Sequence, residues 1–411
     1  MFLKKNKEQT ELIDEVFKIA RKAKKAIHIL GNDNVINASL GSLYDEDENF
    51  VALKSVFNNY RNLKDEEYAK YASSFLGNEE FINILESFII ENKLTKLHTN
   101  LIATSGGTGA ITLAISNLLD TNETIILPNI GWSNYSLIAK EFNLKIDYYQ
   151  LFDNDNNFNL IDLKNKITNS LSIQNKALIV INSPANNPTG YSIKEEEWYE
   201  LVRFINEECN NKEVIILNDI AYIDYSFNLN NSRNYLKILD NLNENGLLII
   251  AYSCSKAFTN YGLRLGASIV ANKNKEIVHS ISNAFNKTCR AYWSNVNNSA
   301  MINITNLLKY HKQEYLKEKD YYINLLKKRA SIIIKEAKDI NLPIYNFNEG
   351  FFITLKIDNN LKDKYHNELL NNNIYSIKVN EGIRIAICSL PIKKCYGLAF
   401  KLNELLNKIR D

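Results

Sequence analysis

Short apolar runs separated by segments of helical length are the feature that most constrains the fold of this chain. Seven such runs lie between residues 100 and 271, namely NLIAT, TIIL, KIDYY, ALIVIN, VIILN, LLIIAY and ASIVA. Continuous apolar runs suit strands that are covered on both faces, and the intervening segments have the length and period of helices. The pattern predicts an α/β fold in which helices wrap a large, mostly parallel seven-stranded sheet.

The pattern changes beyond about residue 300. A long helical tract over residues 306–339 is followed by the apolar runs FFITLKI, IYSIKV and IRIAICSL, which alternate with shorter helical segments. We expect a smaller α+β domain formed by residues 1–50 and 306–411, beside a large domain over residues 51–305. The first 30 residues read as an amphipathic helix with charges of both signs, and no targeting segment is expected there.

Composition narrows the class of partner. Lys and Arg total 49 against 47 Asp and Glu, and these charges are scattered, so neither nucleic acid nor a membrane surface is expected to bind. The five cysteines lack CxxC spacing and the five histidines lack metal-ligand spacing, so no disulfide framework or metal site is expected. A cytoplasmic protein with small-molecule substrates fits these observations.

Polar motifs directly follow five of the apolar runs: SGGTGA (105–110), PNIGW (128–132), SPANNPTG (183–190), DIAY (219–222) and SCSK (253–256). Ligands of open parallel sheets bind at the carboxyl ends of the strands. We therefore expect these motifs to converge on one crevice.

Lys256 and Arg264 stand eight positions apart after the run LLIIAY. Burial and a nearby cation would both lower the pKa of the Lys256 amine, which would let it form a Schiff base with a carbonyl compound. Arg264, with the hydroxyls of Ser253 and Ser255, could clamp a phosphate. A lysine after a strand is more commonly a solvated surface residue, so this pair alone decides nothing.

The other candidates also have structural explanations. The glycines of SGGTGA could admit an anion at a helix N-terminus or form a plain turn. Asn187 could donate to a ligand oxygen, or its loop could be a rigid connection. Asp219 ends an apolar strand, where it needs a cation or serves as a cap, and Tyr222 could face the same place. Trp132 could stack on a flat ring or belong to the core, and Arg384 could meet an internal or a substrate carboxylate.

Taken together and in this order, these groups describe a site for pyridoxal 5′-phosphate. The most specific part is the run NPTG, Asp219-x-x-Tyr222 placed 29 residues after Gly190, and Ser253-x-Ser255-Lys256 with Arg264 beyond it. From INASLG (36–41) to EGIRIA (381–386), the sequence resembles the class I/II aminotransferase family of fold type I, in its aspartate/aromatic branch.

The resemblance implies a role for each matching residue. Lys256 would carry the cofactor and move the proton at the substrate Cα, and Asp219 would pair with the pyridine nitrogen. Asn187 and Tyr222 would hydrogen-bond the phenolic oxygen of the ring, and Trp132 would stack on the ring. The residues implied to hold the phosphate are Gly107, Thr108, Ser253, Ser255 and Arg264.

The substrate site and the subunit contact are implied in the same way. Arg384 would bind the substrate α-carboxylate with help from Asn187 and the backbone of Gly41. Tyr71 is an approximate match to a tyrosine that reaches the cofactor of a partner subunit, so the resemblance implies a homodimer.

Two departures from the family pattern bear on binding. Gly106 stands where relatives often have a hydroxyl residue, which would remove one phosphate contact. Met301 or Ile302 stands where dicarboxylate-specific members place an arginine. An aspartate donor would leave its distal carboxylate unpaired, at a cost of about a hundredfold in selectivity. The resemblance therefore favours an aromatic or other neutral L-amino acid as donor.

The implied activity is transamination to a 2-oxo acid such as 2-oxoglutarate, by a ping-pong mechanism through pyridoxamine phosphate. The same residues would serve a carbon–sulfur β-lyase on this fold, so that alternative stays open. A non-catalytic regulator that binds pyridoxal phosphate or an amino acid is the alternative from another class. A nucleotide-binding dehydrogenase is disfavoured by the missing GxGxxG fingerprint.

Overall fold

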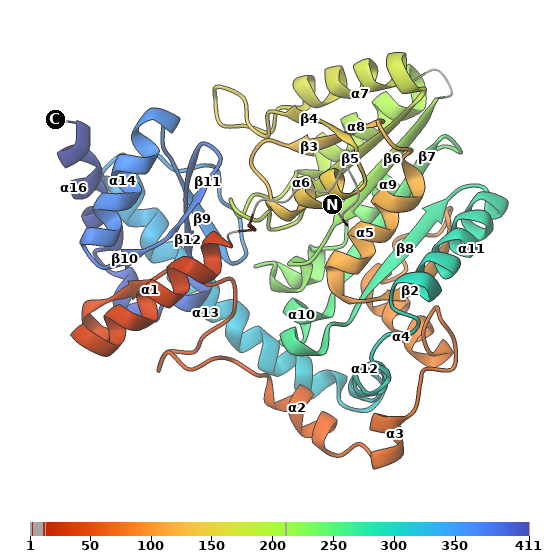
Figure 1. Cartoon of the computed structure of the whole chain (residues 1–411), viewed down its shortest axis with the longest axis horizontal. Helices are drawn as coiled ribbons and strands as arrows, with labels where there is room; N and C mark the ends of the chain where they lie inside the picture. Colours follow the sequence, from red (N-terminus) through yellow and green to blue (C-terminus); the bar gives the residue numbers. More distant parts are fainter. Residues whose placement is uncertain (1, 3–10, 13, 210–211, 411) are drawn as a thin grey trace.

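A twisted seven-stranded sheet forms the centre of the larger part of the molecule (Figure 1). The computed structural model describes residues 2, 11–12, 14–209 and 212–410. The strands are β2 (His98–Thr104), β3 (Thr124–Pro128), β4 (Lys145–Tyr149), β5 (Lys176–Asn182), β6 (Glu213–Asp219), β7 (Gly246–Ser253) and β8 (Gly266–Asn272). Each contains one of the seven predicted apolar runs, so the prediction of the sheet is confirmed.

The strand order is β2-β8-β7-β6-β5-β3-β4, and only β8 runs antiparallel to its neighbours. Because the other strands are parallel, the carboxyl ends of β5, β6 and β7 lie side by side at one edge of the sheet. This edge is where the motifs of residues 183–190, 219–222 and 253–256 begin.

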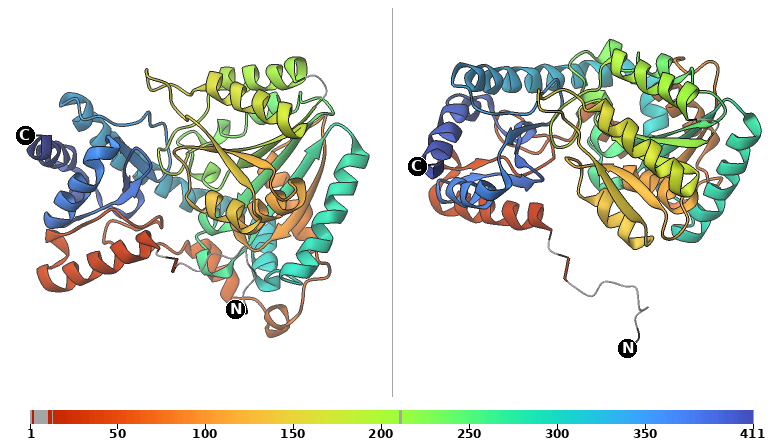
Figure 2. Two further views of the ribbon diagram at one scale, coloured as in Figure 1. Left: turned by 45° about the horizontal axis from the view of Figure 1, so that its top comes forward. Right: turned by 90° about the horizontal axis from the view of Figure 1, so that it is seen from above.

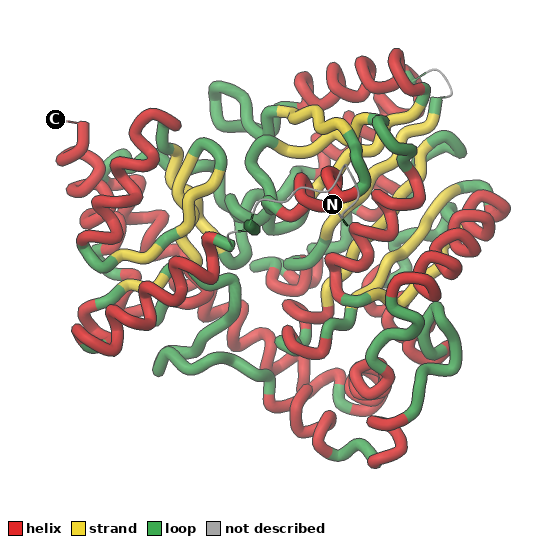
Figure 3. Tube along the Cα trace, in the orientation of Figure 1, coloured by secondary structure: helices red, strands yellow, loops and turns green. Residues whose placement is uncertain are grey.

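Helices cover both faces of this sheet (Figure 3). Along β6, Val214 and Ile216 belong to one hydrophobic cluster, while Ile215 and Leu217 belong to the other. This alternation is what a strand buried on both faces requires. The helices of one face are α5 (Gly106–Leu118), α6 (Asn134–Glu141) and α11 (Lys275–Tyr292), and those of the other include α4 (Glu79–Ile90), α7 (Leu160–Gln174), α8 (Glu195–Glu208) and α12 (Asn298–Tyr310). The remaining helices of this part are α2 (Lys54–Arg61), α3 (Asp65–Ala69), α9 (Leu236–Leu239) and α10 (Cys254–Ala257).

The smaller part combines both ends of the chain. Strands β9 (Phe352–Lys356), β11 (Ile377–Val379) and β12 (Gly382–Ala386) form an antiparallel sheet, and β1 (Ile36–Asn37) pairs in parallel with β10 (Ile374–Tyr375). Its helices are α1 (Glu15–Leu30), α14 (Asn359–Asn371), α15 (Ile392–Cys395) and α16 (Leu398–Arg410). The long helix α13 (Lys312–Asp339) runs from the large part to the small one, as the two views of Figure 2 show.

The predicted fold class is thus confirmed, with two refinements. The helical tract of residues 306–339 is divided between α12 and α13 at His311. Helix α1 lies in the predicted N-terminal helical segment, whereas residues 1, 3–10 and 13 of that segment lie outside the described residues. The domain boundaries near residues 50 and 305 stay predictions. Among the described helices, none is long and apolar enough to cross a membrane.

Candidate active site

Lys256 lies in α10, directly after β7. Its Nζ donates a 3.0 Å hydrogen bond to the carbonyl oxygen of Gly41 and lies 4.8 Å from the ring centroid of Tyr261 and 5.7 Å from that of Tyr222. Burial is the largest cause that lowers the pKa of Lys256 to about 8. The guanidinium groups of Arg384 and Arg264 act in the same direction, whereas Cys388 and Asp219 oppose it. A substantial fraction of neutral amine at neutral pH makes Lys256 a competent nucleophile.

Asp219 closes β6 beside that amine. Its Oδ2 accepts a 2.5 Å hydrogen bond from the phenol of Tyr135, and its Oδ1 accepts a 3.0 Å bond from the backbone N–H of Ala221. Burial raises the pKa of Asp219, whereas these two hydrogen bonds and Lys256 lower it. A buried carboxylate so placed favours a cationic partner. Burial also raises the pKa of Tyr222, which keeps its phenol protonated.

Arg264 and the glycines after β2 form a compact pocket wall. Arg264 Nη1 donates a 3.1 Å hydrogen bond to Oγ of Ser255. Gly106 has a φ of +71°, and a Cβ there would lie 2.5 Å from Arg264 Nη2. A Cβ on Gly107 would lie 3.0 Å from Cβ of Ser253. A hydroxyl residue therefore cannot take the place of Gly106 without moving Arg264, which is the physical reason for the departure noted in the sequence.

Helix α5 begins at Gly106, so Gly107 and Thr108 lie in its first turn. The free N–H groups and the dipole at a helix N-terminus favour an anion, and the guanidinium of Arg264 adds a positive charge beside it. This wall has the chemistry of a phosphate site.

Arg384, in β12, is a buried cation. Its Nη2 donates to the carbonyl oxygen of Ser39 at 2.9 Å, its Nη1 donates to Oδ1 of Asn187 at 3.3 Å, and the centre of the guanidinium lies 4.3 Å from the ring centroid of Phe352. Within the described residues, Nε has no hydrogen-bond partner and no carboxylate pairs with Arg384. A buried guanidinium that has no carboxylate partner and one N–H without an acceptor is suited to bind a ligand carboxylate.

The segment from Ser39 to Gly41 closes the site from the small part. Its three consecutive carbonyl oxygens accept hydrogen bonds from Arg384, from Sγ of Cys388 at 3.4 Å and from Lys256. The predicted backbone contact at Gly41 therefore faces the groups predicted for the cofactor and the substrate.

Three of the residues singled out in the sequence lie in different environments. Trp132 is partly buried after β3, with its ring 5.4 Å from the ring of Tyr135 in an edge contact. Tyr71 is 86 % exposed between α3 and α4, so the single chain does not bring it into the site. Met301 is fully buried in α12.

Sequence reasoning missed three residues of this site. Tyr135 lies on α6, where its apolar ring fits the helix period and nothing marks its hydroxyl as functional. The ring of Tyr261 lies beside the amine of Lys256, and the thiol of Cys388 donates to the carbonyl oxygen of Leu40, the residue before Gly41. The one sequence signal for Tyr135 was its position three residues after Trp132, which had been singled out as a candidate.

These residues fit pyridoxal 5′-phosphate. The cofactor has an aldehyde, a pyridine nitrogen and a phosphate. The amine of Lys256 suits the aldehyde, the carboxylate of Asp219 suits the pyridine nitrogen, and the guanidinium of Arg264 suits the phosphate. The close packing of Gly106 under Arg264 and the unpartnered Nε of Arg384 are features of this chain that such ligands explain.

Comparison with known proteins agrees with this description. The family described as "Aminotransferase class I and II" matches residues 33–399. A crystal structure of an aminotransferase from Anaerococcus prevotii superposes with a TM-score of 0.94 at 31% sequence identity, covering 98% of this chain and 100% of that one. The chain belongs to the class I and II aminotransferase family, whose members transfer amino groups with pyridoxal 5′-phosphate. The predicted family and cofactor are thereby confirmed.

Curated relatives are more distant. A histidinol-phosphate aminotransferase of Sulfurisphaera tokodaii is 26% identical over 260 residues, which cover 60% of this chain and 66% of the relative. An aromatic-amino-acid aminotransferase of Pseudomonas aeruginosa is 25% identical over 194 residues, covering 46% of each protein. The chain thus matches about half to two thirds of the length of these relatives.

Proposed function

We propose that this protein is a pyridoxal-phosphate-dependent aminotransferase. It takes the amino group of an aromatic or other neutral L-amino acid and passes it to a 2-oxo acid such as 2-oxoglutarate, in two half-reactions of a ping-pong mechanism. The observation that supports this most directly is the convergence of the Lys256 amine and the unpaired Arg384 guanidinium on the same three-residue segment, Ser39 to Gly41. Together they provide a nucleophile and a carboxylate site within one crevice.

The bound cofactor supplies an electron sink for the carbanion formed at the substrate Cα. Asp219, held as a carboxylate by Tyr135 and Ala221, keeps the pyridine nitrogen protonated. Lys256 would hold the cofactor through its aldehyde carbon and, once the substrate amine has displaced it, would as a neutral amine accept the proton from the substrate Cα and deliver it to the former aldehyde carbon of the cofactor. Asn187 and Tyr222 would donate to the phenolic oxygen, and Trp132 would cover the ring.

The phosphate is proposed to bind between the first turn of α5 and the residues after β7. Gly107 and Thr108 offer backbone and hydroxyl donors, Ser253 and Ser255 offer hydroxyls, and Arg264 supplies the charge. Arg264 is already fixed by its bond to Ser255, so little side-chain freedom is lost when the phosphate binds.

The donor preference rests on Met301 and Ile302, which stand where dicarboxylate-specific family members place an arginine. Arg384, with Asn187 and the backbone of Gly41, binds the α-carboxylate. The buried thioether of Met301 has no charge for a second carboxylate. The name of the aromatic relative from Pseudomonas aeruginosa supports the same preference, whereas the name of the other relative gives histidinol phosphate, which has a phosphate ester in place of the α-carboxylate.

We further propose a cytoplasmic homodimer. All five cysteines are buried free thiols, as is usual in a reducing compartment. Tyr71 exposes 86 % of its surface, which leaves its phenol available to the phosphate site of a partner subunit.

Steady-state assays with purified protein test this function. Phenylalanine, aspartate, histidinol phosphate and cystathionine, which has a β carbon–sulfur bond, are each supplied with and without 2-oxoglutarate. We expect turnover that requires the 2-oxo acid, with phenylalanine at least a hundredfold above aspartate in kcat/KM. Turnover without a 2-oxo acid, with release of ammonia, would instead identify a β-lyase. A preference for aspartate or histidinol phosphate would overturn the donor assignment.

A further inference from the structure

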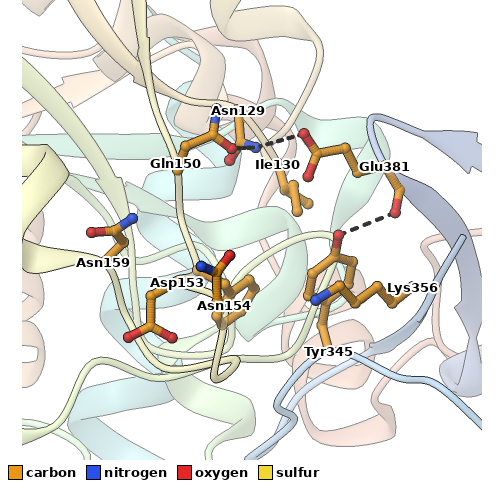
Figure 4. A pocket seen from close by; sticks show the side chains of 10 residues that line it. Asn129, Ile130, Gln150, Asp153, Asn154, Asn159, Tyr345, Lys356 and Glu381 are labelled. Atoms are coloured by element: carbon orange, nitrogen blue, oxygen red, sulfur yellow. Dashed lines mark hydrogen bonds between the residues drawn. The ribbon is translucent and has the colours of Figure 1, made fainter. Parts of the chain in front are cut away.

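A cavity of about 460 Å³ lies between the two parts of the molecule, apart from the residues assigned to the cofactor (Figure 4). Asn129, Gln150 and Asn154 line it from the loops after β3 and β4, while Tyr345, Lys356 and Glu381 line it from the small part. A volume of this size accommodates a small metabolite. The cavity is therefore large enough to be a binding site in its own right.

The two walls of the cavity are held together by contacts across the interface. Nδ2 of Asn129 donates to Oε1 of Gln150 at 2.6 Å and to Oε1 of Glu381 at 3.3 Å. The rings of Phe152 and Tyr345 stack with their centroids 5.1 Å apart, and the phenol of Tyr345 donates to the carbonyl oxygen of Glu381 at 3.1 Å. These contacts give the cavity a defined shape.

Lys356 and Glu381 give this cavity neighbouring charges of opposite sign. Lys356 pairs across the strands with Gly382, the residue after Glu381, and the side chains of Lys356 and Glu381 both line the cavity (Figure 4). Among the described residues neither group has an ion-pair partner. Glu381 accepts a hydrogen bond from Asn129 instead, and Nζ of Lys356 lies 5.8 Å from the ring centroid of Tyr345. An ammonium and a carboxylate group on one ligand carbon would satisfy both charges.

The rest of the lining is rich in side-chain amides. Asn129 is buried, with only 8% of its surface exposed, and its amide is fixed by the hydrogen bonds described above. Gln150, Asn154 and Asn159 add further amide groups, which donate and accept hydrogen bonds. Asp153 adds a second carboxylate to the lining, and its Oδ1 accepts hydrogen bonds from the backbone N–H groups of Asp155 and Asn157. The amide groups of the lining match a polar uncharged side chain.

We propose that this cavity is a binding site for a polar α-amino acid, distinct from the catalytic site. Its carboxylate is taken by Lys356, its ammonium group by Glu381, and its side chain by the amides of the large part. The site adjoins the catalytic residues through short connections. Ile130 of the cavity wall is two residues from Trp132, and Thr354, two residues before Lys356, pairs across the strands with Arg384. Bound amino acid would thus join the two walls next to the catalytic crevice.

Equilibrium dialysis of the cofactor-loaded protein with isotope-labelled L-glutamine tests this site without relying on turnover. Arg384→Gln removes the proposed catalytic carboxylate site, so remaining saturable binding reports the cavity. We expect one site per chain in Arg384→Gln. Adding Lys356→Gln or Glu381→Gln should weaken it at least tenfold, while adding Lys335→Gln, at an exposed position of α13, should leave it unchanged.

Analogues of the probe locate the charges. The amine-free 4-carbamoylbutanoate and the carboxylate-free 4-aminobutanamide should each bind at least tenfold more weakly than L-glutamine. If Arg384→Gln fails to fold, the same comparison is made on the wild-type protein, where Lys356→Gln should remove one of two sites. The proposal is overturned if no saturable site remains beyond the catalytic one, or if neither cavity substitution changes the affinity. These outcomes do not depend on transamination, so they are distinguishable from a failure of the proposed function.

Discussion

The phenol of Tyr135 donates a 2.5 Å hydrogen bond to Oδ2 of Asp219 in a fully buried part of the active site. Tyr135 is on α6, one turn after Trp132, while Asp219 ends β6. Burial raises the pKa of Asp219, and the hydrogen bond from Tyr135 opposes this by stabilising the ionised carboxylate. Tyr135 thus acts on the cofactor through Asp219, as a positioning residue.

Tyr135→Phe removes this hydrogen bond and should raise the pKa of Asp219. Hydrogen bonds to charged groups contribute about 1.5–3 kcal/mol, so kcat should fall roughly tenfold or more. The pH profile of kcat should also shift its acid limb to higher pH. Tyr149→Phe is the matched control, because that buried phenol donates instead to the carbonyl oxygen of Val180. Equal effects of both substitutions would contradict the assigned role.

Gly106→Ala should impair cofactor binding. A Cβ there would approach Arg264 Nη2 to 2.5 Å, and the φ of +71° is unfavourable for alanine. We expect the Kd for pyridoxal 5′-phosphate, measured by dialysis, to rise at least tenfold. Gly262→Ala serves as the control, since a Cβ at Gly262 meets nothing within 4 Å and Gly262 is two residues from Arg264. An unchanged Kd for Gly106→Ala would show that Arg264 does not hold the phosphate.

The capture of the cofactor should depend on pH with a midpoint near the pKa of Lys256, about 8. Only the neutral amine attacks the aldehyde, so the capture rate of cofactor-free protein should rise with pH up to about 9 and then level off. Arg384→Gln removes a cation that lowers this pKa, and should move the midpoint upward. A rate that still rises steeply at pH 10 would mean that Lys256 titrates like an exposed lysine.

Lys319 provides a prediction about stability. Its side chain is fully buried on α13, with Nζ 4.8 Å from the ring centroids of Tyr225 and Tyr315, and burial lowers its pKa to about 8. The unfolded chain therefore binds more protons between about pH 8 and 10.5, so this group adds stability as the pH rises through that window. Below pH 8 it carries the full penalty of a buried charge.

Lys319→Met should accordingly stabilise the protein at pH 7 by roughly 2–3 kcal/mol, with the difference vanishing near pH 10.5. Urea unfolding at a series of pH values measures this change. Lys335→Met, at an exposed position of the same helix, should give no pH-dependent difference. Destabilisation by Lys319→Met at pH 7 would show that contacts of the buried ammonium outweigh its desolvation.

The sequence predicts the sheet and the residues at its strand ends because both are local patterns. A buried strand is an apolar run, and Lys256, Asp219 and Asn187 each follow such a run directly. The antiparallel direction of β8 leaves no such trace, since a strand buried on both faces looks the same in either direction. The partnership of Tyr135 and Asp219 joins positions 84 residues apart, which no local pattern records.

The cavity between the two parts was beyond sequence reasoning for the same reason. Asn129 and Glu381 are 252 residues apart, and each alone is an ordinary polar residue. Tyr71 illustrates the opposite case. The resemblance to the family identifies Tyr71 as a candidate for contact with the cofactor. Its contacts in the proposed dimer depend on a second subunit and not on the fold of this chain.

Transamination by this protein is best tested by the first half-reaction of the cofactor-loaded protein with an aromatic or neutral L-amino acid and no 2-oxo acid. We expect one equivalent of 2-oxo acid per chain, with the bound cofactor recovered as pyridoxamine 5′-phosphate, and neither product from Lys256→Ala. The proposed function is wrong if no such amino acid converts the cofactor, or if the Lys256→Ala protein converts it as fast as the wild type does.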